Sequence, residues 1–244
     1  MNAPPLPGLD ELARARGLSV DQAAALARML AALAAEPDPP TRIDPGDAVD
    51  GHLADSLAGL AVPELAGTAR VADLGAGAGF PGLALAVALP GSHVDLVEAS
   101  ARKCAVIERL IAAARLTNAR ALARRAEELT RTEGRCAYTA VTARALAPLP
   151  VLVEYAAPLL GEAGVLVAWK GRRQAGEERA GGRAAAQVGL ALSRVIAVTP
   201  FAGAHSRHLH VFTKTAPTPE RFPRRPGIAV KRPLGQEERA ASDG

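Results

Sequence analysis

The chain has 244 residues, with 29 Lys and Arg against 25 Asp and Glu, which gives a formal net charge of +4. This length suits one domain with an appendage and allows a large buried core without a disulfide or metal staple. No stretch approaches the roughly 20 unbroken apolar residues of a membrane-spanning helix. The first ten residues, MNAPPLPGLD, lack the basic leader and apolar run of a secretory signal. These features exclude a membrane protein and a disulfide-rich secreted scaffold.

The cysteines agree with a cytoplasmic location, and the charge balance bears on the kind of partner. Cys104 and Cys136 are far apart and form no C-x-x-C pair, so neither a zinc knuckle nor a redox dithiol is indicated. Two isolated thiols fit a reducing compartment. The isoelectric point near 9.5 permits a polyanionic partner without requiring one.

Residues 1–65 are expected to form a helical extension. Ser19 and Gln22 have the spacing of a capping box, which predicts a helix start. Four apolar residues then share one helical face: Leu26, Met29, Leu30 and Leu33. A second helix is predicted from about Asp47.

From residue 66 to 215, short β-type runs alternate with helical ones. The strands are expected at 69–74, 93–99, 119–123, 138–143, 164–170, 192–200 and 207–215, and the helices at 81–89, 101–115 and 149–160. This alternation predicts a Rossmann-like, seven-stranded, mostly parallel α/β sheet. The last two strands have no helix between them, so we expect an antiparallel pair at the end. Residues 216–244 are expected to form a basic Pro- and Arg-rich tail, with a disordered end over 235–244.

The sharpest motif is the glycine-rich loop VADLGAGAGFPG over 71–82, where an apolar strand meets a helix. Its glycines let the backbone turn tightly and approach a ligand. Pro81 suits the first turn of the following helix, whose N–H groups would point toward the ligand. Gly77, Gly79 and Gly82 satisfy G-x-G-x-x-G, so a dinucleotide remains possible at this point.

Two acidic residues belong to the predicted cofactor site, and one of them, Asp73, favours S-adenosylmethionine over a dinucleotide. Asp73 lies two residues before Gly75, where its carboxylate could meet a cationic amino group directly or through water, whereas a pyrophosphate would gain nothing from it. Glu98 ends the second strand and could accept both ribose hydroxyls of either cofactor. We therefore expect Asp73, Gly77 and Glu98 to belong to a cofactor site.

The chain resembles the RsmG (glucose-inhibited division protein B) family of methyltransferases from about residue 41 to 233. The resemblance is carried, in order, by GHLADSL (51–57), DLGAGAGFPG (73–82), LVEASARK (96–103), RAEEL (125–129), TARALAPL (142–149), AWKG (168–171) and RFPRRPGIAVKRPL (221–234). It implies a class I S-adenosylmethionine-dependent methyltransferase that methylates N7 of one guanosine in 16S ribosomal RNA. By the same resemblance, the cofactor contacts fall on Gly75, Phe80, Ala126, Glu127 and Arg144.

No catalytic acid or base is expected for that reaction. Guanine N7 has a free lone pair, so attack on a sulfonium methyl needs no proton removal. Alignment of the reacting atoms can supply about 7–11 kcal/mol of the barrier reduction. The fourth strand ends in TARA over 142–145 instead of the N/D-P-P-Y of exocyclic-amine methyltransferases, which argues against methylation of an adenine amino group.

Several polar residues are candidates for the RNA side of the site, each with a structural alternative. His52 and Asp55 share a helix face and could reach RNA, or could tether the N-terminal helices. Lys170 could contact substrate or extend from a strand end into water. Arg144 could donate to guanine or pair with a carboxylate. Three tail arginines are expected to contact phosphate: Arg221, Arg224 and Arg225. Alternatively, the tail packs on the core through Phe222 and Ile228.

A metal site is not expected, because His205, His208 and His210 have no nearby acid or thiol in the sequence. Nothing in the sequence demands more than a monomer. Two other functions stay open at this point: a nicotinamide-dependent oxidoreductase that uses the same glycine loop, and a non-catalytic ribosome-assembly factor that keeps the fold.

Overall fold

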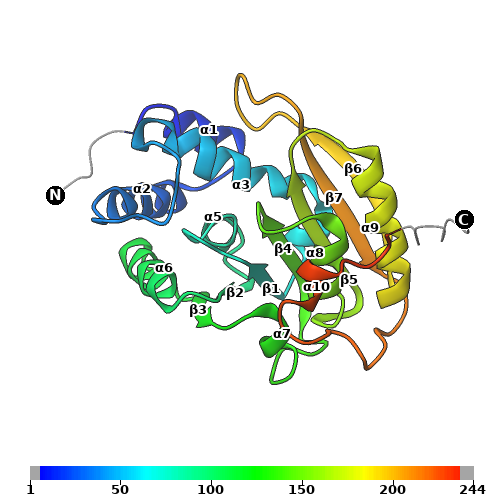
Figure 1. Ribbon diagram of the computed structural model, residues 1–244. Coiled ribbons are helices and arrows are strands. Elements are labelled where there is room, and N and C mark those ends of the chain that lie inside the picture. The colour runs from blue at the N-terminus through cyan, green and yellow to red at the C-terminus, as the bar shows by residue number, and fades with distance from the viewer. Residues whose placement is uncertain (1–5, 237–244) are drawn as a thin grey trace, which may run out of the picture.

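The computed structural model describes residues 6–236 and contains one seven-stranded sheet in the order β3-β2-β1-β4-β5-β7-β6 (Figure 1). The strands are β1 (Arg70–Leu74), β2 (His93–Glu98), β3 (Ala119–Ala123), β4 (Tyr138–Arg144), β5 (Leu160–Lys170), β6 (Leu190–Val198) and β7 (Arg207–Lys214). The five strands from β3 to β5 run parallel, and β7 is antiparallel to both of its neighbours. The predicted sheet and its terminal antiparallel pair are confirmed.

Helices cover both faces of this sheet. The α-helices are α1 (Leu9–Ala15), α2 (Val20–Ala34), α3 (Asp55–Leu57), α4 (Pro63–Ala66), α5 (Gly82–Ala88), α6 (Ala101–Ala114), α7 (Ala126–Leu129), α8 (Leu149–Ala156), α9 (Ala175–Val188) and α10 (Ile228–Lys231). In Figure 1, α2, α5 and α6 lie on one side of the sheet, and α8 and α9 lie on the other. Each group buries apolar residues in its own cluster against the central strands.

The start of α2 matches the sequence prediction. The Ser19 hydroxyl accepts a hydrogen bond from the Gln22 backbone N–H, and the Gln22 side chain accepts one from the Ser19 N–H. The helix buries its apolar stripe in the same cluster as α5 and α6. The N-terminal helices therefore share a core with the sheet.

The second predicted N-terminal helix is not one regular α-helix. It begins with the 3-10 turn η1 (Pro45–Asp47), continues as the π-helical segment η2 (Val49–Ala54), and passes through α3 into the 3-10 turn η3 (Ala58–Ala61). A π-helical turn has hydrogen bonds between residues five apart, where an α-helix has them between residues four apart, and such turns are frequent at functional sites. It carries His52, and Asp55 follows it directly.

Residues 216–236 pack back on the α8 face of the sheet and do not extend away from it. Phe222 is 3% exposed and Ala229 is 2% exposed, and both belong to the apolar cluster of α8 and α9. This position agrees with the packing alternative for the tail. Most of the segment predicted to be disordered, residues 237–244, lies outside the described residues.

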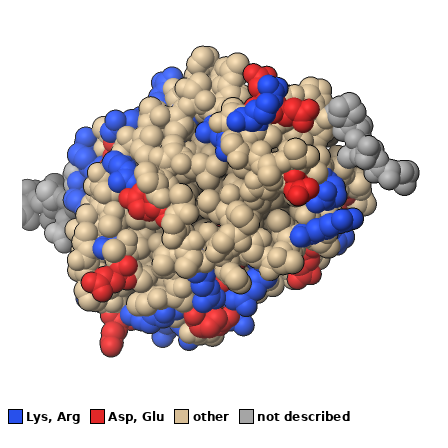
Figure 2. All heavy atoms as spheres, turned by 180° about the vertical axis from the view of Figure 1, so that it is seen from behind, with Lys and Arg blue, Asp and Glu red and all other residues tan. Residues whose placement is uncertain are grey.

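The outer surface gives two further observations. On the face shown in Figure 2, basic and acidic side chains are interspersed around a largely uncharged centre. That face therefore has no extended region of a single charge. Among residues 6–236, no helix is long and apolar enough to cross a membrane.

Candidate active site

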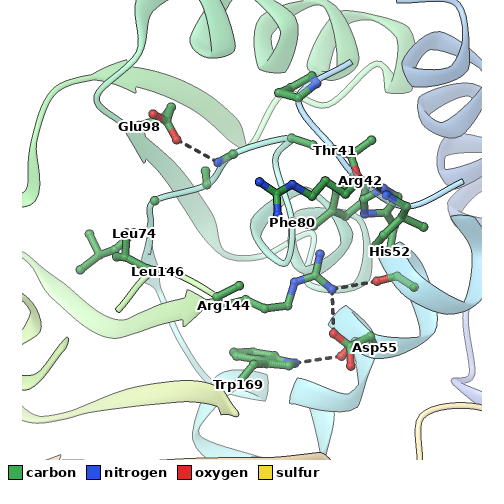
Figure 3. Close-up of a pocket in the computed structure, with 18 of the residues that line it drawn as sticks. Thr41, Arg42, His52, Asp55, Leu74, Phe80, Glu98, Arg144, Leu146 and Trp169 are labelled. Atoms are coloured by element: carbon green, nitrogen blue, oxygen red, sulfur yellow. Dashed lines mark hydrogen bonds and ion pairs between the residues drawn. The ribbon is translucent and has the colours of Figure 1, made fainter. Parts of the chain in front are cut away.

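A large cleft opens at the carboxyl ends of β1, β2 and β4, where ligands bind in open α/β sheets. Its volume is about 1250 Å³, which exceeds the usual 300–1,000 Å³ of a single small-molecule site. Its wall is formed by the glycine loop, residues 40–55, the end of β2, residues 124–127, the end of β4 and residues of the β6–β7 region. Figure 3 shows the part between the glycine loop and Trp169. The cleft has room for a cofactor and a second ligand.

The glycine loop is shaped to receive a ligand. Gly77 has a φ of +59°, and a Cβ placed there would meet only the Gly75 carbonyl oxygen, at 3.8 Å, so the space above it is open. Glu98 lies beside it and accepts hydrogen bonds from the backbone N–H groups of Gly77 (3.1 Å) and Ser100 (2.9 Å). An open glycine loop next to a cleft-lining carboxylate fits S-adenosylmethionine, whose ribose hydroxyls need an acceptor. Gly75, Gly77 and Glu98 thus lie where the sequence prediction places them.

Asp73 does not face the cleft, so the expectation of a direct contact with the cofactor is not met. Its side chain is fully buried, accepts a hydrogen bond from the Thr142 hydroxyl (2.8 Å) and accepts another from the Gly82 N–H (2.9 Å). A Cβ on residue 82 would lie 2.8 Å from the Asp73 carboxylate, so only glycine allows this approach. Asp73 therefore ties β1 to β4 and to the start of α5 beneath the loop. Burial raises its pKa to about 6.

Ala126 and Glu127 form the wall after β3 that the resemblance assigns to the cofactor. Glu127 is only 4% exposed, and its carboxylate accepts a hydrogen bond from the Gly227 N–H (3.1 Å). It also lies against Tyr155, whose pKa rises to about 12 because of burial and the neighbouring carboxylates. A backbone N–H of the C-terminal segment thus fixes the carboxylate of Glu127, which is one of the expected cofactor residues.

Arg144 pairs with a carboxylate, which was the structural alternative. Its guanidinium donates to Asp55 (2.7 Å) and to the Gly51 carbonyl (2.9 Å), and it lines the cleft (Figure 3). The backbone carbonyl of Asp55 accepts from the Trp169 indole N–H (2.8 Å). These bonds fasten the π-helical segment to the ends of β4 and β5. The Trp169 contact was not anticipated from the sequence, because a lone Trp at a strand end carries no spacing signal.

His52 is buried in the cleft wall and does not form a pair with Asp55. Its ring stacks on Phe80, with centroids 4.4 Å apart, and its Nε2 hydrogen-bonds to the Thr41 hydroxyl at 3.0 Å. Its Nδ1 is buried without a hydrogen-bond partner among the described residues. Burial, assisted by the positive charge of Arg144, lowers its pKa to about 4. His52 therefore supports Phe80 as a neutral ring.

Lys170 is neutralised within the protein. Its ammonium lies 2.6 Å from the carboxylate of Glu177, at the start of α9, although the side chain also lines the cleft. Of the three histidines considered as metal ligands, His208 bonds to the Gly171 carbonyl and His210 to Glu178. Within residues 6–236, no group of three or more His, Cys, Asp or Glu side chains could hold a metal ion.

The tail arginines have different environments, and Arg224 is paired within the protein, which disfavours the phosphate role expected for it. Arg224 donates two hydrogen bonds to Glu154, at 2.8 and 2.5 Å, and Glu154 is 1% exposed. Drawing this guanidinium away to a phosphate would leave the buried Glu154 unpaired, which is costly. Arg221 lies over the ring of Phe222, at 4.9 Å, and remains exposed, as does Arg225. Only the latter two stay candidates for phosphate contact.

Comparison with solved structures defines the fold class. The fold matches a predicted O-methyltransferase from Agrobacterium tumefaciens with a TM-score of 0.52 and 24% identity, over 67% of this chain and 81% of that one. It also matches a Burkholderia thailandensis N1-methyltransferase solved with S-adenosylhomocysteine, with a TM-score of 0.52 and 14% identity, over 70% and 82% of the two chains. The protein has the fold of the class I S-adenosylmethionine-dependent methyltransferases.

Sequence comparison gives the family within that class. Residues 22–209 match the family rRNA small subunit methyltransferase G (GidB), and the chain belongs to it. A ribosomal RNA small subunit methyltransferase G from Chloroflexus aggregans is 45% identical over 184 residues, which are 75% of this chain and 76% of that protein. A protein of the same name from Deinococcus deserti is 41% identical over 189 residues, 77% and 78% of the two chains. Family membership disfavours the oxidoreductase alternative.

Proposed function

We propose that this protein transfers a methyl group from S-adenosylmethionine to N7 of a guanosine in 16S ribosomal RNA. Membership of the rRNA small subunit methyltransferase G family supports the reaction and the substrate class. The observation that carries the proposal is the cleft itself, in which an open glycine loop and Glu98 occupy one part while a further wall remains for a second ligand.

S-adenosylmethionine, when bound, supplies a methyl group activated by its sulfonium charge. We assign Gly75, Gly77 and Phe80 to its binding surface, with Glu98 as the acceptor for the ribose hydroxyls. Ala126, Glu127 and Arg144 complete the same surface, and Asp73 shapes the loop from below. These assignments combine the family resemblance with the placement of each residue around the cleft.

The protein's part in this reaction is to bind and orient two reactants and to exclude water. Guanine N7 attacks through its own lone pair, so no side chain has to remove a proton. The cleft agrees with this requirement, because His52 is held between Phe80 and Thr41, and Asp73 is sealed under the loop. The Arg144–Asp55 pair fixes the floor of the site in one geometry, which favours alignment.

The same proposal includes the setting in which the protein acts. Its RNA substrate places it in the cytoplasm, where ribosomal subunits are assembled. We propose that it works there as a monomer and without a metal ion.

Cofactor binding and turnover test this proposal separately. Calorimetry should show binding of S-adenosylmethionine and none of NAD. Radiolabelled methyl groups should then pass to small-subunit RNA from cells that lack the protein. Preference for NAD would overturn the cofactor assignment. Cofactor binding without any methyl transfer to free RNA or to the subunit would instead indicate the non-catalytic assembly factor.

A further inference from the structure

The connection between β6 and β7, residues 199–206, belongs to the cleft wall, and none of its residues is assigned to the cofactor above. It rises beyond the sheet beside the N-terminal helices (Figure 1). Phe201 and Ala202 line the cleft from this loop, and Arg207 and His208 continue the same wall at the start of β7. The loop is therefore an outer border of the cavity that holds the glycine loop.

Phe201 differs from the other aromatic residues of that wall. The rings of Phe80, Tyr155 and Trp169 are at most 9% exposed, whereas Phe201 is only half-buried. Phe80 is also stacked on His52, but Phe201 makes no ring–ring contact with any described residue. Phe201 therefore lines the cleft with a half-buried ring that stacks on no other described ring.

The strand pair that carries this ring contributes only neutral and basic side chains, which favours an anionic partner. No Asp or Glu occurs between residues 179 and 219, a span that includes both strands and their loop. Arg207 closes the loop with its side chain 46% exposed and its Nε 3.7 Å from Asp55, the carboxylate that also binds Arg144. The loop is thus joined electrostatically to the floor of the site and keeps a guanidinium accessible to solvent.

We propose that the β6–β7 loop binds an unpaired nucleotide of the RNA substrate, with Phe201 stacked on a base and Arg207 beside a phosphate. This inference rests on the proposed function and specifies how the RNA is held. Proteins commonly hold single-stranded RNA by stacking bases on aromatic rings and pairing phosphates with Arg. One half-buried ring with an exposed guanidinium on the same wall suits a nucleotide better than a protein partner, which would need a wider apolar patch.

The first test measures binding of the full chain to transcribed small-subunit RNA by filter retention at several salt concentrations. Phe201→Ala should weaken binding by about 5- to 150-fold, since stacking on one base is worth about 1–3 kcal/mol. Phe201→Trp should retain the affinity, and Phe201→Leu, which keeps apolar bulk without the ring, should lose most of it. Val20→Ala is the matched control, because Val20 is 86% exposed on α2 and lies outside the cleft.

The dependence on salt separates the two contacts. Phe201→Ala should leave the slope of log affinity against log salt unchanged, because no phosphate contact is lost. Arg207→Gln should reduce that slope by about 0.7, the value for one phosphate of a single strand. Affinity for S-adenosylmethionine should stay the same in every Phe201 variant.

Three outcomes would overturn the inference: wild-type affinity in Phe201→Ala, equal losses in Phe201→Ala and Phe201→Trp, or a change in self-association by sedimentation in place of a change in RNA binding. The binding assay needs no turnover. Normal RNA retention without methyl transfer by the wild-type chain would therefore refute the proposed function alone. A wild-type chain that retains neither small-subunit RNA nor the small subunit would refute both.

Discussion

Asp73 belongs to a motif that predicts a ligand-binding loop, but its own side chain is bonded within the protein. The spacing before Gly75 correctly predicts a glycine loop, but spacing alone does not fix the direction of the Asp73 carboxylate. That direction depends on Thr142, 69 residues away, and on the missing side chain at Gly82. The motif therefore predicts the loop, while a tertiary contact decides what the acid does.

Glu98 remains the residue that we expect to bind the cofactor ribose. Glu98→Ala should weaken S-adenosylmethionine binding by about 1–3 kcal/mol, because the hydroxyls lose their acceptor and two loop N–H groups lose theirs. Glu98→Gln, which keeps one acceptor oxygen, should give a smaller loss. Calorimetry on the three proteins measures this, and equal affinities would remove Glu98 from the site.

Gly77→Val should abolish cofactor binding while the fold persists. A branched side chain at this position would occupy the open space above the loop. Gly17→Val is the matched control, because Gly17 has a similar φ of +65° and no neighbour within 4 Å of an added Cβ. Both variants should lose about 1–2 kcal/mol of stability from left-handed backbone strain. Cofactor binding by Gly77→Val would show that the ligand does not approach this glycine.

The buried His52 should make the protein sensitive to acid. Its pKa is lowered from 6.5 to about 4 in the folded chain, so the unfolded chain binds the proton more tightly and stability falls as pH drops between these values. Between pH 7 and pH 5 this effect should amount to about 2 kcal/mol. The raised pKa of Asp73 acts in the opposite direction, since protonation then favours the folded state.

Comparison with His52→Gln isolates the histidine, because Asp73 is present in both proteins. Urea unfolding at the two pH values should show that the wild type loses about 2 kcal/mol more than the variant. An identical pH dependence would mean that His52 is as easily protonated in the folded state as in the unfolded one.

Among the elements, regular helices and strands with clear periodicity were predicted well, and irregular ones were not. No helix is predicted over α9, where adjacent glycines at 181 and 182 lower the helix propensity. The glycine at 181 lets α9 pack closely on α8, because a Cβ at this position would lie 2.8 Å from the Leu149 Cβ. This tertiary packing stabilises the helix despite its low propensity. The π-helical form of η2 likewise could not be predicted, because the spacing of apolar residues does not distinguish a short π-helical turn from an α-helix.

The C-terminal segment is the element whose role changes most. Its basic composition suggested RNA contact, but Arg224 is bound to the buried Glu154, and the Gly227 N–H is bound to Glu127. Sequence composition cannot show this, because a buried acid on α8 is indistinguishable from a surface acid. The segment therefore supports the wall of the cofactor site.

Arg224→Ala should destabilise the protein by about 3 kcal/mol, because Glu154 is left buried and unpaired. Affinity for S-adenosylmethionine should also fall, since the segment no longer holds Glu127 in place. Arg225→Ala, the neighbouring exposed arginine, should change neither quantity. Urea unfolding and calorimetry on the two variants measure both effects. Equal stability of the two variants would contradict the proposed support.

At the scale of the whole molecule, one sheet brings distant segments to a common edge. The glycine loop after β1, Glu98 at the end of β2 and Arg144 at the end of β4 come from different parts of the chain and border one cleft. This convergence follows from parallel strands and could be predicted from the sequence. The covering of the cleft by η2 and the β6–β7 loop, and the support of its wall by the C-terminal segment, depend on tertiary contacts.

The central claim is methylation of a guanosine at N7 in small-subunit RNA, and direct mapping of that modification tests it. Small-subunit RNA is isolated from cells with the protein, without it, and complemented with either the wild-type or the Gly77→Val chain. We expect N7-methylguanosine at a defined position only where the wild-type chain is present. The same modification pattern in all four samples, or a methyl group on another atom, would contradict the account.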